Sequence, residues 1–190
     1  MSGYLSGVLA ILGINIIFAY SIYITAATGQ LNLGGAGFQA IGAYACALLS
    51  NELGYSIYLT LIFSAVLGGA ISFLIAFPVL RTKGVYMVLA TFAIAEIVAG
   101  IILNSDYLGG PTGMIVKAYI ETEVVLVVAI IVVFLGFYIM STRIGLAMRA
   151  VHDDEAVADL MGVDKRAIQV GAFTIGGAIA GLSGGLYALY

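Results

Sequence analysis

The chain has 190 residues, of which 63% are hydrophobic and 9% are charged, with a formal net charge of −3. A soluble domain carries about 25% charged residues, so this composition excludes a surface that faces water throughout. The mean hydropathy of +1.15 predicts a membrane protein of the all-α class, because lipid offers no hydrogen-bond partners to an open backbone. The single cysteine, Cys46, excludes an internal disulfide.

Long apolar runs define the predicted elements. A helix needs about 20 apolar residues to cross a bilayer. We predict a polytopic transmembrane bundle with about six spans, forming one transmembrane domain over residues 1–190. The spans are expected at residues 4–27, 34–49, 55–80, 85–103, 123–140 and 167–190.

The connection into the second span and its first half have an unusual composition. The segment GQLNLGGAGFQAIGAY, residues 29–44, mixes Gln30, Asn32 and Gln39 with five glycines. Polar side chains at membrane depth are costly unless they face protein or water, and glycine-interrupted helices near the midplane are one way to build a transport site. We interpret the segment as part of a substrate pathway containing Gln30 and Asn32. A tight turn before a closely packed helix is the alternative.

Small residues recur at four-residue intervals in the third and sixth spans. In membranes this spacing marks faces where helix backbones approach closely. We predict helix packing through these faces, with a pore-lining role as the alternative. The residues are Ser64, Gly68 and Ser72 in one span and Gly177, Gly181 and Gly185 in the other.

The fourth span contains an acidic residue, Glu96, near its middle. A carboxylate there costs about 2.5–3.5 kcal/mol on insertion scales, so we expect Glu96 to face the bundle interior. It is a candidate gate or pathway residue, or a hydrogen-bonding strut between helices. Thr91 is a second pathway candidate, but it lies about 140° away around the helix and need not share a face with Glu96.

The basic residues divide unequally between the two sides of the predicted bundle. Six of the seven lie in the connections 81–84 and 141–166, and only Lys117 lies in the connection 104–123. The positive-inside rule therefore makes 81–84 and 141–166 cytoplasmic. The opposite connection contains LGGPTGM, which predicts tight turns and is either a docking surface for a binding protein or a plain surface turn.

The connection 141–166 holds the only histidine and half of the acidic residues. It predicts two short amphipathic helices, the first over residues 145–151. Asp153, Asp154 and Glu155 favour the start of the second, Gly162 favours its end, and Asp164 is placed to cap the next span.

One face of the second short helix is apolar. Val157, Leu160 and Met161 share it by three- and four-residue spacing. Two interpretations remain open: a helix docked in the groove of a soluble partner, and a helix resting on lipid headgroups.

Catalytic patterns are not visible in the sequence. His152 stands alone in a charged connection, so neither a metal site nor a catalytic triad is expected, and no G-x-x-x-x-G-K-[ST] motif occurs. We expect a protein that is not an enzyme, that binds no cofactor itself, and that has membrane lipid but no nucleic acid as a partner.

Five segments in register resemble the permease subunits of branched-chain amino-acid ABC importers. They are GQLNLGGAGFQAIGAYACALL, LRTKGVYMVLATFAIAEIV, LGGPTGM, STRIGLAMRAVHDDEAVADLMGVD and AFTIGGAIAGLSGGLYA. The fourth resembles the family's coupling segment to the ATPase. The resemblance assigns coupling to Arg143, Gly145, Ala147, Arg149, Ala150, Asp153, Glu155, Ala158, Met161 and Gly162.

The resemblance implies an inner-membrane permease of a bacterium or archaeon. It implies as partners two ABC ATPase subunits that bind the ATP, a second permease, and an extracytoplasmic substrate-binding protein. The chain departs from the family pattern at Gly35, Leu108, Leu146 and His152. The departures at Gly35 and Leu108 leave the solute open between branched-chain amino acids and urea, amides or another small solute. A passive channel, a secondary transporter using Glu96, and a structural subunit are the alternatives. The chain is shorter than such permeases usually are, so we expect part of a longer one.

Overall fold

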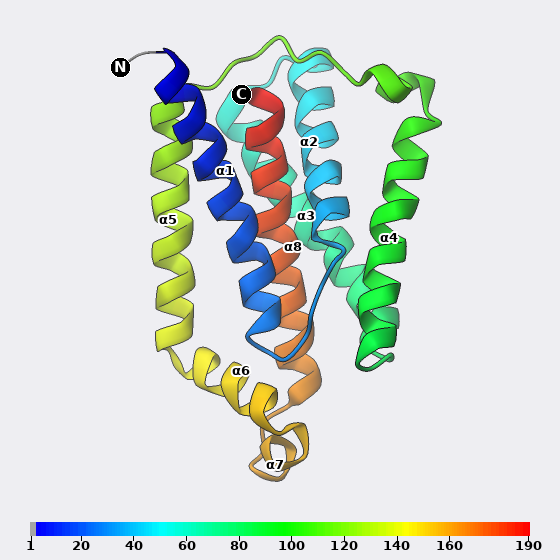
Figure 1. Cartoon of the computed structure of the whole chain (residues 1–190), viewed down its shortest axis with the longest axis vertical. Helices are drawn as coiled ribbons and strands as arrows, with labels where there is room; N and C mark the ends of the chain where they lie inside the picture. Colours follow the sequence, from blue (N-terminus) through cyan, green and yellow to red (C-terminus); the bar gives the residue numbers. More distant parts are fainter. Residues whose placement is uncertain (1–2) are drawn as a thin grey trace.

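The apolar runs form long helices that lie side by side in the computed structural model, which describes residues 3–190 (Figure 1). Within that range, five helices are long and apolar enough to cross a membrane, which confirms the prediction of a helical membrane bundle. They are α1 (Gly3–Ala26), α3 (Ile57–Val79), α4 (Val85–Leu103), α5 (Thr122–Ser141) and α8 (Lys165–Leu189). The remaining helices are α2 (Gly35–Glu52), η1 (Asp106–Leu108), η2 (Gly110–Thr112), α6 (Arg143–Asp153) and α7 (Glu155–Leu160).

The second predicted span is a composite of extended chain and helix. After α1 ends, the chain climbs from the lower end of the bundle as an extended segment and enters α2 above the lower ends of the other helices (Figure 1). α2 has 18 residues and is not among the five helices that meet the length and hydropathy of a span. A discontinuous element of this kind leaves backbone groups without helical partners, and membranes tolerate it only inside protein or beside water.

α8 is the central helix and packs against α1, α2 and α3. Its small residues meet those of α3 as predicted: a Cβ added at Gly68 would lie 2.7 Å from the Gly177 carbonyl oxygen, and one at Gly185 would lie 2.5 Å from Ser64 Oγ. Ser72 Oγ also donates a hydrogen bond to the Phe173 carbonyl at 2.7 Å. Helix packing, and not pore lining, explains the spacing.

α5 and α4 lie on opposite sides of this centre (Figure 1). α5 packs on α1, where a Cβ at Gly13 would lie 3.3 Å from Val125. α4 contacts mainly α2, and Met87 and Thr91 are its buried residues. Most of the apolar surface of α4 therefore points away from the described bundle.

The connection between α4 and α5 is tied to the end of α2. Asn51 Nδ2 donates to the Ile115 carbonyl at 2.8 Å, and the Tyr107 hydroxyl donates to Glu52 Oε1 at 2.5 Å. The predicted tight turns are present, because Gly109 and Gly113 adopt φ of +85° and +73°, which only glycine adopts freely.

Candidate functional site

The chain turns sharply after α5 into an elbow, defined here as residues 143–163, which lies beyond the ends of the long helices (Figure 1). Thr142 is extended, with ψ of 175°, and separates α5 from α6. α6 runs from Arg143 to Asp153 and is longer at both ends than the predicted 145–151. Arg143 and Asp153 are therefore the exposed terminal residues of α6.

Two of the predicted coupling residues hold α6 against the end of α5. Arg149 Nη2 donates a hydrogen bond to the Met140 carbonyl at 2.6 Å. Gly145 is buried, and a Cβ there would lie 2.5 Å from Met140 Cα. No larger side chain fits without moving the backbone. Met148 and Val151, each 1% exposed, complete the buried side of α6.

α7 is a short helix with a defined cap at each end. Asp154 Oδ1 accepts hydrogen bonds from the backbone N–H groups of Ala156 and Val157, at 2.8 and 3.1 Å. Gly162 has φ of +81°, and the N–H of Val163 donates to the Ala158 carbonyl at 3.0 Å, the pattern of a Schellman cap. Both predicted ends are confirmed.

The next cap is also confirmed. Asp164 Oδ1 accepts from the Ala167 N–H at 3.1 Å and starts α8, so α8 begins at Lys165, two residues before the predicted span.

The apolar face of α7 points outward. Val157 is 51% exposed, Leu160 88% and Met161 80%, whereas Ala158 is buried. The predicted sharing of one face is confirmed, and the structure gives that face no partner within residues 3–190. An apolar tip on a capped helix is a surface that a second molecule would cover.

Glu155 connects α7 to two other parts of the bundle. Its carboxylate pairs with Lys83 Nζ at 3.4 Å and accepts a hydrogen bond from Gln169 Nε2 at 3.1 Å. Lys83 lies between α3 and α4, so the predicted placement of both basic connections at one end is confirmed. Sequence reasoning missed Gln169, because a single glutamine one turn into an apolar helix gives no signal of its partner.

In the extended segment between α1 and α2, polar side chains are buried and the apolar side chains between them are exposed. Gln30 and Asn32 are each 4% exposed, while Leu31 and Leu33 are 51% and 46% exposed. Successive side chains of extended chain point to opposite sides, so the segment turns its amides inward and its leucines outward. The segment before α2, predicted to be irregular and polar, is thus a stretch of extended chain and not a simple tight turn.

Two of the predicted pathway residues come together where α2 begins. Thr91 Oγ1 accepts a hydrogen bond from the Leu33 N–H at 3.1 Å, and Asn32 Oδ1 accepts from the Gly34 N–H at 2.8 Å. A Cβ at Gly34 would lie 3.0 Å from both Asn32 Oδ1 and the Thr91 carbonyl oxygen. Gln30 is separate from this group, and its Oε1 is buried without a hydrogen-bond partner in the described chain.

Glu96 does not face the bundle interior, and that expectation is wrong. It is exposed on α4. The reason is helical geometry: α4 packs through Thr91, and Ala95 lies against Gly37 of α2, while Glu96 is turned about 140° from Thr91.

A mostly apolar cavity of about 470 Å³ lies between α2, α8 and the α4–α5 connection. Tyr44, Tyr187 and several alanines line it, with Gln39 at its wall. Gln39 Nε2 donates to Ser183 Oγ at 3.1 Å. The polarity of Gln39 was visible in the sequence, but its pairing with Ser183, 144 positions later, was not.

The amino-acid sequence is similar to a protein family and to several known proteins. The family described as branched-chain amino acid transport system / permease component matches residues 4–190. The high-affinity branched-chain amino acid transport system permease protein LivM of Escherichia coli (strain K12) is 31% identical over 93% of this chain and 48% of its own length. Its Salmonella typhimurium counterpart is 30% identical, with the same coverage of both chains.

An archaeal protein is also similar. The probable branched-chain amino acid transport permease protein LivH of Methanocaldococcus jannaschii is 27% identical over 86% of this chain and 58% of its own length. The chain spans about half the length of the LivM proteins it matches. No solved structure matches it significantly.

Proposed function

Because the chain belongs to the branched-chain amino acid transport system permease component family, we propose that it forms part of the membrane pathway of an ABC importer for branched-chain amino acids. Several apolar helices make it a multi-pass membrane protein. The importer would lie in the inner membrane of a bacterium or archaeon. Its connections at 81–84 and 141–166 would face the cytoplasm, since they carry six of the seven basic residues.

The exposed tip of α7 is the observation that carries the proposal. Leu160 and Met161 are at least 80% exposed on a helix capped at both ends, outside the long helices (Figure 1). In the proposed assembly they insert into a groove of an ATPase subunit, the mode by which short amphipathic helices bind partners. ATP is bound and hydrolysed on the two ATPase subunits, and this chain is not an enzyme.

Motion of α7 would reach the membrane helices through named contacts. Glu155 links α7 to the α3–α4 connection and to α8, while Gly145 and Arg149 hold α6 to the end of α5. A displacement of the tip therefore acts on both sides of the bundle. Switching between outward- and inward-facing states by such rigid-body motion is a common mechanism in transport.

The proposed solute pathway runs along the extended segment between α1 and α2 and the residues beside it. Asn32 and Thr91 bind neighbouring backbone N–H groups where α2 begins. Gln30 lines a pocket together with residues of the two basic connections. The apolar cavity beside Gln39 suits an aliphatic side chain, because its walls offer dispersion contacts and few polar groups. Glu96, on the open side of α4, would face the second permease or a water-filled path between the two.

The test compares two matched substitutions, Leu160→Glu in the α7 tip and Ile115→Glu at the opposite end. Both side chains are 88% exposed, so neither change disturbs the core. In the full importer, we expect Leu160→Glu to reduce co-purification of the ATPase and ATP-driven uptake of leucine, and Ile115→Glu to leave co-purification unchanged. Equal ATPase recovery with both variants would contradict the proposal, as would leucine uptake that survives ATP depletion.

A further inference from the structure

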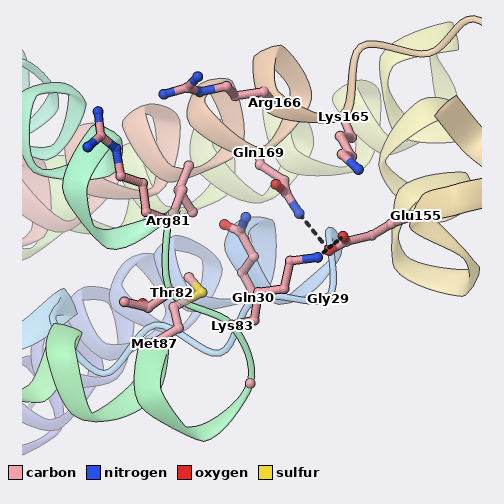
Figure 2. A pocket seen from close by; sticks show the side chains of 12 residues that line it. Gly29, Gln30, Arg81, Thr82, Lys83, Met87, Glu155, Lys165, Arg166 and Gln169 are labelled. Atoms are coloured by element: carbon pink, nitrogen blue, oxygen red, sulfur yellow. Dashed lines mark hydrogen bonds and ion pairs between the residues drawn. The ribbon is translucent and has the colours of Figure 1, made fainter.

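A polar pocket of about 520 Å³ lies where α3, α4 and α8 meet at the elbow end of the bundle (Figure 2). Four of the seven basic residues of the chain line it: Arg81, Lys83, Lys165 and Arg166. Glu155 is the one acidic residue in the lining. The pair Arg81 and Lys83 lies far in the sequence from the pair Lys165 and Arg166, so the fold creates this concentration of positive charge.

The pocket's own carboxylate does not neutralise this charge. Glu155 already pairs with Lys83 at 3.4 Å and accepts a hydrogen bond from Gln169. The carboxylate nearest to Lys165 is that of Asp159, which lies outside the pocket at 3.9 Å. Within residues 3–190, Arg81 and Arg166 have no carboxylate within 4.0 Å. Like charges held together repel one another, and a bound anion would relieve that repulsion.

Gln30, on the inner wall of the pocket, is a second indication that the pocket binds a ligand. Gln30 is 4% exposed, its side chain points into the pocket toward Gln169 (Figure 2), and its Oε1 has no hydrogen-bond partner. Buried polar atoms in native proteins are nearly always paired. The matching ligand therefore combines anionic oxygens for the basic residues with a hydroxyl donor for Gln30.

We infer that this pocket binds a phosphate-bearing anion, and that the headgroup of an anionic phospholipid such as phosphatidylglycerol is its source. The arginines suit phosphate because their planar guanidinium groups donate to two oxygens at once. A glycerol headgroup supplies hydroxyl donors, and a pocket of this volume is within the usual range for a small ligand.

The position of Arg166 favours lipid over free phosphate. Its guanidinium carbon lies 6.0 Å from the centre of the Phe77 ring, in the last turns of the apolar helix α3. Phe77 is 39% exposed, and α3 is long and apolar enough to cross a membrane. Basic pockets between membrane helices at this depth are typical headgroup sites. The pocket shares Gln30, Lys83 and Glu155 with the proposed transport machinery, but Arg81 and Arg166 have no part in it. A failed lipid titration with the two arginine variants would therefore leave the proposed transport role standing.

The experiment measures lipid binding to the full chain in detergent by native mass spectrometry. Phosphatidylglycerol is compared with phosphatidylcholine for the wild type, Arg81→Gln, Arg166→Gln and the double variant. Lys117→Gln is the matched control, since it removes one exposed basic residue at the opposite end. We expect each arginine substitution to weaken phosphatidylglycerol binding about fivefold, and the control to leave it unchanged.

A second arm adds inorganic phosphate as a competitor. Displacement of phosphatidylglycerol by phosphate supports the shared site. Phosphate binding that depends on Arg81 and Arg166, without preference for phosphatidylglycerol, supports the anion site and assigns it to a soluble source. Equal phosphatidylglycerol binding by all variants, with no competition by phosphate, overturns the inference.

Two further variants guard against misfolding. Arg166→Lys keeps the charge but loses the two-oxygen geometry of the guanidinium, and should bind phosphatidylglycerol between wild type and Arg166→Gln. Gln30→Leu removes the amide oxygen that would accept from a headgroup hydroxyl, and should weaken binding of phosphatidylglycerol more than binding of phosphate. If Arg166→Lys, with an unchanged thermal unfolding midpoint, loses binding as completely as Arg166→Gln, a charge-based site is ruled out.

Discussion

Lys83 Nζ lies 3.4 Å from Glu155 Oε2 and joins the α3–α4 connection to α7, 72 positions later in the chain. The two side chains are 81% and 40% exposed, so the pair contributes at most about 1 kcal/mol to the free energy of unfolding. Its importance in the proposed transport cycle is therefore mechanical: it links the apolar tip to a second part of the bundle.

Reversing one charge of this pair should impair coupling while leaving the fold intact. We expect Lys83→Glu to lower ATP-driven uptake by about fivefold or more, the scale of a coupling free energy between distant sites. The double variant Lys83→Glu/Glu155→Lys restores the attraction and should recover part of the uptake. Uptake assays combined with thermal unfolding check this, and full activity in Lys83→Glu would contradict it.

Glycines in α8 should differ sharply in their tolerance of a methyl group. A Cβ at Gly181 would lie 3.1 Å from Gly68 Cα and closer still to the Ser64 carbonyl, whereas one at Gly171 meets nothing within 4 Å. Gly181→Ala should lower the free energy of unfolding by about 1–3 kcal/mol through overpacking. Gly171→Ala, in the same helix, should be neutral or stabilising by up to about 1 kcal/mol.

The measurement for this pair is the unfolding midpoint of each variant in detergent. Equal midpoints would mean that α3 and α8 do not approach as closely as described.

The contact between Thr91 and Leu33 should hold the extended segment in place. Thr91→Val keeps the shape of the side chain but removes the acceptor for the Leu33 N–H, which costs about 1–3 kcal/mol when the donor stays buried. Hydrogen exchange at residues 31–34 should become faster in this variant. Thr91→Ser retains the hydroxyl and should exchange like the wild type, and slow exchange in Thr91→Val would disprove the contact.

Glu96 should react as a residue that faces water or a second subunit. A carboxylate in contact with lipid at mid-span costs about 2.5–3.5 kcal/mol on insertion scales, so the exposed face around Glu96 needs another environment. In the assembled importer, Glu96→Cys should react with a water-soluble maleimide or crosslink to the second permease. Phe134→Cys, on the exposed face of α5, should do neither.

The native thiol does not interfere with this labelling, because Cys46 is 0% exposed. A Glu96→Cys protein that is as inert as Phe134→Cys would place this face of α4 in lipid.

The sequence by itself determined the features that depend on neighbouring residues. Apolar length placed the spans within a few residues, Asp154, Gly162 and Asp164 marked helix ends through local hydrogen bonds, and the amide-rich stretch at Gln30 and Asn32 marked a break. Four-residue spacing of small residues also identified the packed faces of α3 and α8, since close backbone approach needs small side chains wherever the partner lies.

Only the tertiary structure decided which polar groups meet. Helices such as α4 and α5 are apolar all round, so periodicity does not show which face turns inward, and the rotation of each helix depends on contacts with distant segments. That rotation turned Glu96 outward and Thr91 toward Leu33. The fold also brought Lys83 to Glu155 and gathered Arg81 and Arg166 at one pocket, because α3 packs on α8 and α4 packs mainly on α2.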